Sequence, residues 1–495
     1  MPKPITHGTQ LLLDLPLAAI KAAKEGPAKT MKGLLQEHFR CPDDMGVLRP
    51  PAGDAGEAGF FRLGPDITLF GGWASGGAAP RPEDARADAL KAVAIGDGEC
   101  RLPFDAAEAI NNLLFERYPG AGQPAGAGPI WKRAAAQAYY TLRPMLPVGV
   151  RKHLQRSVVG RKRNAAPSFP AWPIDTTVER ALDTLLLLAM RARGVDRIPF
   201  IWFWPDGYSS AVAMTHDVET AAGRDFTPKL MDLDERYGMK GAFEIIPEHR
   251  YDVPEVWLAN IRDRGFEINV HDLNHDGRLF SSRDEFLRRA ERINAYGRQW
   301  GAQGFRSAVL YRNLDWFGAL RFDYDMSLPN GAHFHPQAGG CCAVRPYFLG
   351  DMVEIPGTAA QDYILFHILG DYSTQVWEQQ LAATAAAHGV MCFSIHPDYI
   401  IEQRARDIFQ RLGEILLAER RQGQRWFALP REISHWWRQR RAMTLRHDGA
   451  AWRIAGDGAE RARIAYAEIH DDRLRYVLPT TGATHQPALT ARQNS

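Results

Sequence analysis

The stretch Gly265-Phe-Glu-Ile-Asn-Val-His-Asp-Leu-Asn-His275 joins an apolar, strand-like run to two histidines. His271 and His275 are separated by three residues, so both imidazoles can face one point if the chain turns helically just after the strand. A transition metal is the usual occupant of such a point, because imidazole nitrogen is a common ligand of these ions. The spacing therefore predicts a metal site at the end of a strand.

Three further polar motifs end similar apolar runs. They are Thr215-His-Asp-Val-Glu219, Gly304-Phe-Arg-Ser307 and Phe393-Ser-Ile-His-Pro-Asp398. In parallel α/β folds the C-terminal ends of the strands form one rim, and this rim carries the active site. We therefore expect the reactive residues of all four motifs to lie on one surface.

The pattern between residues 175 and 440 alternates short apolar runs with helical periodicity, which predicts a parallel α/β sheet. Strands are expected at 211–215, 241–246, 266–270, 352–355 and 390–395. One helix should follow Ser282, where Glu285 completes a capping box, and its apolar face should carry Phe286, Ile293 and Trp300. A second helix should end at His388-Gly389, because glycine suits the position after a helix.

The flanking regions have a different texture. Residues 1–130 read as an accessory α/β region with one clear helix that begins near Asp105, and residues 131–174 as a basic helical segment and linker. The basic run at 151–163 is either a patch for an anionic partner or a solvated helix face. Residues 441–495 contain short strand candidates between Gly and Asp turns, which predicts a small antiparallel β appendage.

The composition narrows the class of protein. The 495 residues carry a formal net charge of only +2, so no general attraction to nucleic acid is expected. The five scattered cysteines suit a reducing compartment better than a disulfide framework. The N-terminus lacks a signal-peptide profile, and no run approaches the ~18 apolar residues of a transmembrane helix. We expect a cytoplasmic protein without a transmembrane segment.

A catalytic metal needs a third protein ligand and an open position for water. Asp217 and Glu219 are the natural carboxylate sources. The metal would lower the pKa of bound water and polarise a carbonyl, while a second carboxylate takes a proton from that water. His396, on the far side, is our candidate for protonating a departing amine.

The four motifs, taken in order, resemble those of the polysaccharide deacetylase family, also known as the NodB-homology family or carbohydrate esterase family 4. The similarity spans the region from 195 to 430, where Lys240-Gly-Ala-Phe-Glu-Ile also resembles the second strand of the family. The resemblance implies a distorted (β/α)7-type barrel and a divalent metal, with zinc as the expected ion. It also implies hydrolysis of N-acetyl or O-acetyl groups on sugars.

By this resemblance, each motif receives a role. His271 and His275 become metal ligands, Asp217 occupies the position of the general base, Arg306 orients that base, and His396 becomes the general acid.

The first motif departs from the family pattern. The usual motif has two adjacent aspartates, of which the second binds the metal, whereas Val218 occupies that position here. Asp217-Val-Glu219 resembles a variant in which one residue separates the two carboxylates, with Glu in place of Asp. On this interpretation Glu219 is the third ligand; alternatively, Asp217 binds the metal and the base lies elsewhere. His216 either joins the site or packs at the end of the strand.

Other candidates have two interpretations each. Asp325 either lines the pocket, or holds a histidine tautomer, or belongs to a surface turn. His333 and His335 belong either to a loop that covers the rim and touches substrate or to an ordinary loop. Three tryptophans either stack on sugar rings or belong to the core: Trp202, Trp204 and Trp316.

These observations predict a metal-dependent hydrolase that removes an acyl group, expected to be N-acetyl, from an amino sugar or glycan. Zinc, cobalt, nickel and manganese all suit a site of two histidines and one carboxylate. Two rival hypotheses remain. The missing adjacent aspartate motivates a non-catalytic glycan-binding barrel, and relatives of the same barrel that act on non-sugar substrates motivate a cyclic-amide hydrolase.

Overall fold

The computed structural model describes residues 31–42, 47–51, 56–74, 76–96, 98–122 and 169–479, and a curled nine-stranded sheet lies at its centre. The order of the strands is β12-β13-β11-β10-β9-β8-β7-β14, and β15 pairs with the start of β7. Neighbouring strands are parallel except β12 and β13. The strands are β7 (Ser210–Val218), β8 (Gly241–Ile245), β9 (Glu267–His271), β10 (Gly304–Arg306), β11 (Tyr324–Asp325), β12 (Tyr347–Leu349), β13 (Met352–Glu354), β14 (Val390–Ile395) and β15 (Arg425–Phe427).

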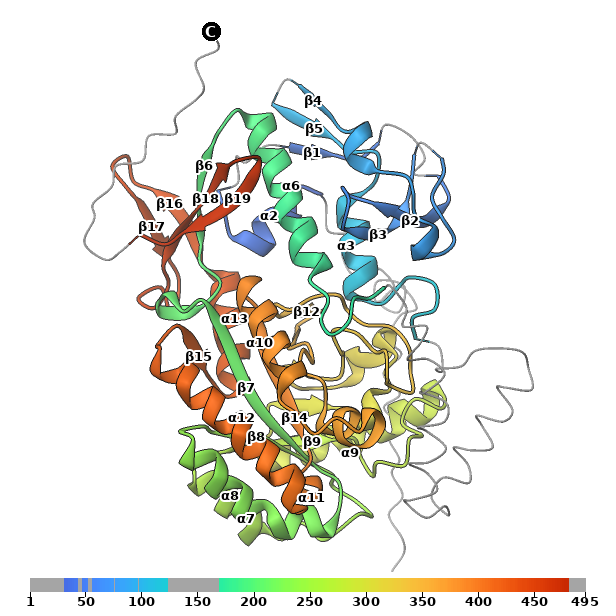
Figure 1. Cartoon of the computed structure of the whole chain (residues 1–495), viewed down its shortest axis with the longest axis vertical. Coiled ribbons are helices and arrows are strands. Elements are labelled where there is room, and N and C mark those ends of the chain that lie inside the picture. Colours follow the sequence, from blue (N-terminus) through green and yellow to red (C-terminus); the bar gives the residue numbers. More distant parts are fainter. Residues whose placement is uncertain are drawn as a thin grey trace, which may run out of the picture.

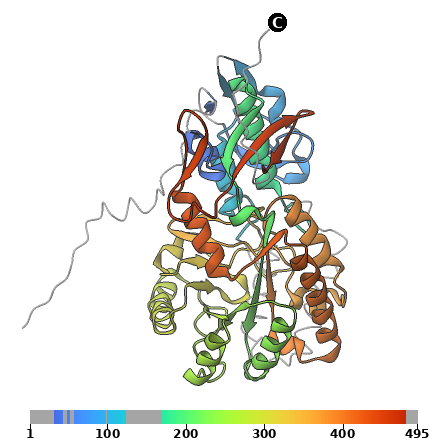
Figure 2. The same cartoon turned by 90° about the vertical axis from the view of Figure 1, so that its left-hand side faces the viewer.

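Helices cover the outer face of this sheet in the lower half of the molecule (Figures 1 and 2). They are α7 (Ala221–Arg236), α8 (Glu255–Asp263), α9 (Arg283–Trp300), α10 (Gln375–Ala386), α11 (Pro397–Ile400), α12 (Gln403–Arg421) and α13 (Pro430–Ala442). Apolar side chains on the inner helix faces pack against the outward side chains of the strands, as the alternation of strand and helix patterns predicts.

Two helix boundaries test the sequence analysis directly. The Ser282 hydroxyl accepts a hydrogen bond from the Glu285 backbone N–H at 3.2 Å, so α9 begins where the capping pattern predicts. At the end of α10 the left-handed residue is His388, with φ of 54°, and not Gly389 as we expected. Gly389 is needed for a different reason, since a Cβ there would lie 2.6 Å from the Val344 carbonyl oxygen.

An irregular segment bridges the two sides of the curled sheet. Gly357 donates to the Leu328 carbonyl at 2.8 Å, beyond the end of β11. Two residues later, Ala359 donates to the Cys392 carbonyl of β14 at 3.2 Å. The segment 357–360 therefore connects opposite edges without forming a regular strand, which gives the sheet a distorted, barrel-like closure.

The upper half combines the N-terminal region with later parts of the chain (Figure 1). Its N-terminal elements are α2 (Met31–Phe39), β1 (Val47–Arg49), β2 (Ala58–Arg62), β3 (Thr68–Gly72), β4 (Ala94–Gly96), β5 (Glu99–Arg101) and α3 (Ala106–Leu114). Asp105 caps α3 as expected, because its carboxylate accepts from the Glu108 N–H at 3.0 Å. The basic run at 151–163 lies outside the described residues.

The C-terminal strands are not a separate appendage in their packing. β16 (Thr444–His447) and β17 (Trp452–Ala455) form a hairpin, whereas β18 (Ile464–His470) pairs with both β19 (Arg473–Val477) and β6 (Arg197–Ile201). α6 (Thr177–Arg193) and β6, which we placed with the barrel, thus pack with the N-terminal region and the C-terminal strands. No described helix is both long enough and apolar enough to cross a lipid bilayer.

Candidate metal centre

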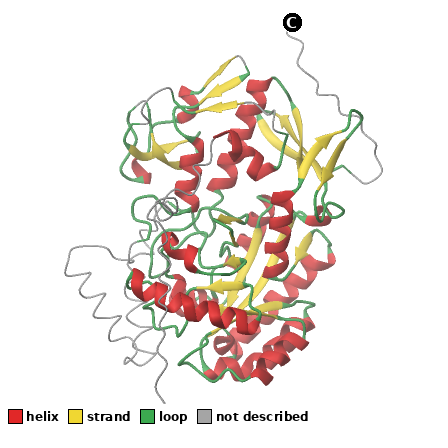
Figure 3. Cartoon of the chain, turned by 180° about the vertical axis from the view of Figure 1, so that it is seen from behind, coloured by secondary structure: helices red, strands yellow, loops and turns green. Residues whose placement is uncertain are grey.

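The predicted residues meet at one rim because of the register of the sheet. His271, the last residue of β9, lies directly opposite Arg306, the last residue of β10. Ile395 of β14 lies opposite His216 of β7, so His396 and Asp217, the next residues of the two strands, are also neighbours. Parallel strands in register place their C-terminal ends side by side. Figure 3 shows the strands of this sheet among the surrounding helices.

Three potential metal ligands converge at this rim. One ligand atom from each of Glu219, His271 and His275 lies within 4.8 Å of the others. Glu219 Oε1 lies 2.9 Å from His275 Nε2 and 3.8 Å from His271 Nε2. The histidine side chains are 1% and 6% exposed, so this carboxylate and these imidazoles form an enclosed cluster with one partly accessible member, Glu219. The sequence-based expectation that two imidazoles and one carboxylate approach each other agrees with these distances.

The tautomer of His271 suits a metal ligand. Its Nδ1 lies 3.1 Å from the backbone carbonyl of Arg306, which can only accept, so Nδ1 carries the proton and Nε2 presents a lone pair. Both Nε2 atoms are buried and lack a well-directed hydrogen bond to a described residue, although Glu219 Oε1 lies 2.9 Å from that of His275. A divalent cation between this carboxylate and the two imidazoles would satisfy all three groups. The donor set therefore fits a metal ion.

The chain reaches His275 by a different route from the one we expected. The residues after β9 form bends and not a helical turn. Asp272 and His275 both adopt left-handed backbone conformations, with φ of 57° and 54°. Such conformations are unfavourable for residues other than glycine, and the surrounding structure must hold them in place. The backbone strain lies at the position that brings the second imidazole to the cluster.

Asp217 lies beside the cluster and is held by two neighbours. Its Oδ1 accepts a short hydrogen bond from the Arg306 guanidinium, and its Oδ2 accepts from the Ser394 hydroxyl at 2.8 Å. Burial alone would raise the pKa of Asp217, but the surrounding groups, above all the positive charge of Arg306, outweigh it and hold the pKa at about 2. Asp217 is therefore an ionised carboxylate that does not belong to the ligand cluster.

His396 lies on the other side of the same group of atoms. Its Nε2 is 3.5 Å from Glu219 Oε1 and 3.9 Å from Asp217 Oδ2, while its Nδ1 is 2.6 Å from Asp362 Oδ1. Burial alone would lower the pKa of His396, but the negative charges of Asp362 and Glu219 raise it well above its usual value. This imidazole is therefore suited to hold a proton that it can donate through Nε2.

Several secondary candidates lie elsewhere. His216 Nε2 is buried 2.7 Å from Asp234 Oδ2, so His216 packs behind β7 and does not join the cluster. Asp325 is fully buried, which excludes a surface turn, and it accepts hydrogen bonds from Ser327 and not from a histidine. His333 contacts the Pro170 carbonyl at 2.8 Å.

The tryptophans are explained by packing. The indole N–H groups of Trp202 and Trp204 donate to the carbonyls of Tyr208 and His388, and both side chains belong to the buried core. Trp316 packs against the rings of Phe280 and Phe286.

Two residues of the site were missed by the sequence analysis. Ser394 is two positions before His396, so strand alternation already places both on one face, but we gave the serine no role. Asp362 precedes a π-helical turn, Tyr363–Leu369, and follows no strand. It lies 34 residues before His396, and its local sequence carries no signal that we recognised.

Comparison with known proteins finds similarity among solved structures. No family model matches the chain, and no curated protein sequence matches it. Among solved structures, it is similar to a Mycobacterium smegmatis protein assigned as a polysaccharide deacetylase, with 20% identity over 48% of this chain and 93% of that chain (TM-score 0.39).

Two further solved structures show the same kind of similarity. The enzyme described as Puue allantoinase is 13% identical over 47% of this chain and 92% of that chain, with a TM-score of 0.37. A family 4 acetyl xylan esterase from Clostridium thermocellum, in complex with a cobalt ion, is 17% identical over 46% of this chain and 91% of that chain, with a TM-score of 0.30. At these identities the likeness concerns the fold alone.

Proposed function

We propose that this chain is a metal-dependent hydrolase that removes an acyl group, in particular N-acetyl, from an amino sugar or glycan. The observation that carries the proposal is the cluster of Glu219, His271 and His275, in which both buried Nε2 atoms face the carboxylate without a well-directed hydrogen bond to a described residue. An ionised carboxylate, Asp217, and a histidine, His396, flank this cluster. This is the arrangement that metal-assisted hydrolysis of an amide requires.

The metal, zinc in our proposal, would be held by Glu219 and the two histidines. When bound, a divalent ion there would polarise the acyl carbonyl and lower the pKa of a water molecule. Glu219 takes the ligand role that the sequence left open between two carboxylates, because its Oε1 lies near both imidazoles whereas Asp217 is engaged by Arg306 and Ser394.

The chain's own side chains then move the protons. Asp217 accepts a proton from the attacking water as the new C–O bond forms, and Arg306 keeps this carboxylate oriented. His396 donates the proton on Nε2 to the departing nitrogen as the C–N bond breaks, which yields a free amine and a carboxylate product. Asp362 holds His396 in the tautomer and orientation that aims Nε2 at the reaction.

The geometry also bears on the non-catalytic alternative. That hypothesis came from the missing adjacent aspartate, which would leave one carboxylate to serve as either ligand or base. Because Glu219 supplies a ligand atom and Asp217 remains outside the cluster, both roles have their own residue. This separation of roles supports catalysis over glycan binding alone.

Metal analysis together with an assay of acetate release tests the proposal. Purified full-length protein should contain about one divalent ion per chain and should release acetate from N-acetylated glucosamine oligomers. His271→Ala should lose both properties and keep its fold, whereas His470→Ala, an exposed histidine 67% accessible at its side chain, should keep both. A wild-type protein without metal, or a His271→Ala variant with wild-type metal content and activity, would refute the proposal.

A further inference from the structure

A pocket lies at the junction of the N-terminal region and the base of the barrel, away from the candidate metal centre. Residues of α2, α3, α6, α13 and the segment 343–348 line it. Arg345 contacts the Ala387 carbonyl just before β14 begins, whereas His396 follows the end of β14, so the length of this strand separates the pocket from the rim. We call it the Arg440 pocket after one of its buried charged residues.

The charge of Arg440 lacks a counter-ion among the described residues. Its side chain is buried, with a residue exposure of 2%, and its Nε and Nη2 donate to the backbone carbonyls of Trp202, Ile201 and Phe39 and to no carboxylate among the described residues. Burial and the nearby charges of Arg40 and Arg345 hold the pKa of Arg440 well below its usual value. A buried cation without an anion is costly, which points to an anionic occupant.

Neighbouring charges define the kind of anion. Arg345 and Arg441 also line the pocket, and the side-chain hydrogen bonds of Arg345 go to the Ala387 carbonyl and the His38 ring, whereas its backbone N–H donates to Glu179 Oε1 at 3.0 Å. Two acids, Glu37 and Glu179, line the same pocket, and burial raises the pKa of Glu179 to about 7. The guanidinium groups of the lining therefore outweigh its carboxylates, which suits an anionic ligand.

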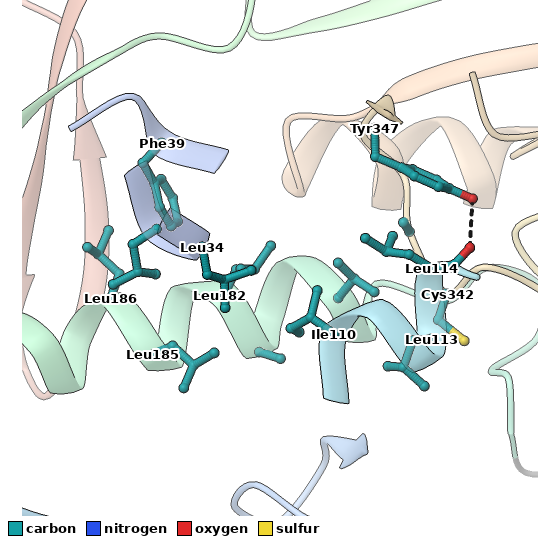
Figure 4. Close-up of a cluster of buried hydrophobic side chains, with 14 of the residues drawn as sticks. Leu34, Phe39, Ile110, Leu113, Leu114, Leu182, Leu185, Leu186, Cys342 and Tyr347 are labelled. Atoms are coloured by element: carbon teal, nitrogen blue, oxygen red, sulfur yellow. Dashed lines mark hydrogen bonds between the residues drawn. The ribbon is translucent and has the colours of Figure 1, made fainter. Parts of the chain in front are cut away.

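The rest of the lining is apolar. Leu34, Ile110 and Leu182 line the pocket from α2, α3 and α6, and Figure 4 shows these side chains gathered between the three helices. Tyr347 closes one side and donates its hydroxyl hydrogen to the Leu114 carbonyl at 3.0 Å. An apolar wall with a few charged groups at one end is typical of a site for a small amphipathic molecule.

We propose that the Arg440 pocket binds a small aliphatic carboxylate. The carboxylate group meets the guanidinium groups of Arg440 and Arg441, and the hydrocarbon chain lies against the leucine and isoleucine side chains. Guanidinium groups bind carboxylates through paired N–H···O hydrogen bonds, which supply the directional part of the recognition. Such a ligand would connect the N-terminal region to the barrel without touching the rim.

Calorimetric titration of the full-length protein with sodium butyrate tests this site, with sodium chloride keeping the ionic strength constant. Saturable binding of butyrate is expected, whereas 1-butanol, which has a similar shape and no charge, should not bind measurably. Arg441→Gln should weaken butyrate binding by about fivefold or more. This variant should fold normally, because Arg441 is exposed and contacts only the Phe348 ring among described residues.

Arg411→Gln is the matched control, since it removes an exposed arginine of α12 that does not line the pocket. It should bind butyrate like the wild type. Absence of saturable butyrate binding, equal binding by Arg441→Gln, or tighter binding of phosphate than of butyrate would each overturn the proposal. None of these results depends on the rim, so the outcome is independent of the proposed hydrolase activity.

Discussion

Asp362 and His396 form one hydrogen-bonded unit at the rim. Asp362 Oδ1 lies 2.6 Å from the ring Nδ1 of His396, and Asp362 Oδ2 accepts the backbone N–H of the same histidine at 2.8 Å. The aspartate therefore fixes both the ring and the backbone of one residue, and it leaves only Nε2 to face Asp217 and Glu219. This contact is the basis of the first prediction.

Asp362→Asn should lower kcat by about 10- to 100-fold and leave the metal content unchanged, because the aspartate supports the general acid and not the ligands. The negative charge of Asp362 helps to raise the pKa of His396, and the proposed mechanism needs the protonated imidazole. Loss of that charge lowers the pKa, so the alkaline limb of the kcat profile should move to lower pH. Asp315→Asn, an exposed aspartate, is the control. An unchanged pH profile would show that Asp362 does not influence the acid.

The two carboxylates of the first motif should have different roles: Glu219 should control the metal content and Asp217 the rate of catalysis. Glu219→Gln should strongly reduce the metal content, because Glu219 Oε1 lies within 4 Å of the Nε2 atoms of both imidazoles. Asp217→Asn should keep the metal and lose about 10²- to 10⁴-fold in kcat, as expected for a lost general base. Metal analysis and acetate release measured on both variants check this division. The opposite pattern would assign the ligand role to Asp217.

The sequence is informative about the site because its motifs sit at the ends of strands. The expected strands at 211–215 and 390–395 correspond to β7 and β14, and parallel register brings Asp217 and His396 together. No equivalent rule locates Asp362, since the residue belongs to an irregular segment that only tertiary packing brings to the histidine. The left-handed conformation of His275 was not predicted either, because histidine is enriched in this region among non-glycine residues but most histidines do not adopt it.

Long-range pairing explains the differences in the outer parts of the fold. β6 pairs with β18, and the partners Ile201 and Ile464 are far apart in the chain. Local periodicity indicates that each is a strand but says nothing about its partner. The sequence analysis therefore placed α6 and β6 with the barrel, whereas they pack with the N-terminal region and the C-terminal strands.

Glu244 offers a test of the polar barrel interior. This side chain is fully buried, and its Oε1 accepts from the Asn269 amide at 3.0 Å while Oε2 has no hydrogen-bond partner among the described residues. Burial raises its pKa to about 7, and the nearby charge of Asp217 adds to this shift, although Arg306 opposes it. An acid whose pKa is raised by folding binds more protons when folded, so it destabilises the protein increasingly as the pH rises from about 4.5 to 7.

Glu244→Gln should therefore be more stable than the wild type at pH 8, by about 1–3 kcal/mol, and should differ little at pH 5. Glutamine keeps the shape of the protonated acid and its bond to Asn269, and it cannot ionise. Urea unfolding at the two pH values measures the difference. Glu291→Gln, an exposed glutamate of α9, should show no such pH dependence. A variant that is less stable than wild type at pH 8 would contradict the assignment.

Gly389 should be intolerant of a side chain for steric reasons. A Cβ at this position would lie 2.6 Å from both the carbonyl oxygen and Cγ2 of Val344, and backbone atoms cannot easily move away. The Val390 N–H donates to the same carbonyl at 2.8 Å, so a shift would disturb the start of β14. Gly389→Ala should lower the free energy of unfolding by about 1–3 kcal/mol, as overpacking of a core does.

The measurement is again urea unfolding, with Gly318→Ala as the control, because a Cβ at Gly318 would meet no atom within 4 Å. His396, the proposed general acid, follows the end of β14. A shift of this strand in Gly389→Ala should therefore also reduce acetate release. The metal content should remain near that of the wild type, since Glu219 follows β7, His271 ends β9 and His275 lies just beyond it. Unchanged stability in Gly389→Ala would mean that the segment around Val344 can move without cost.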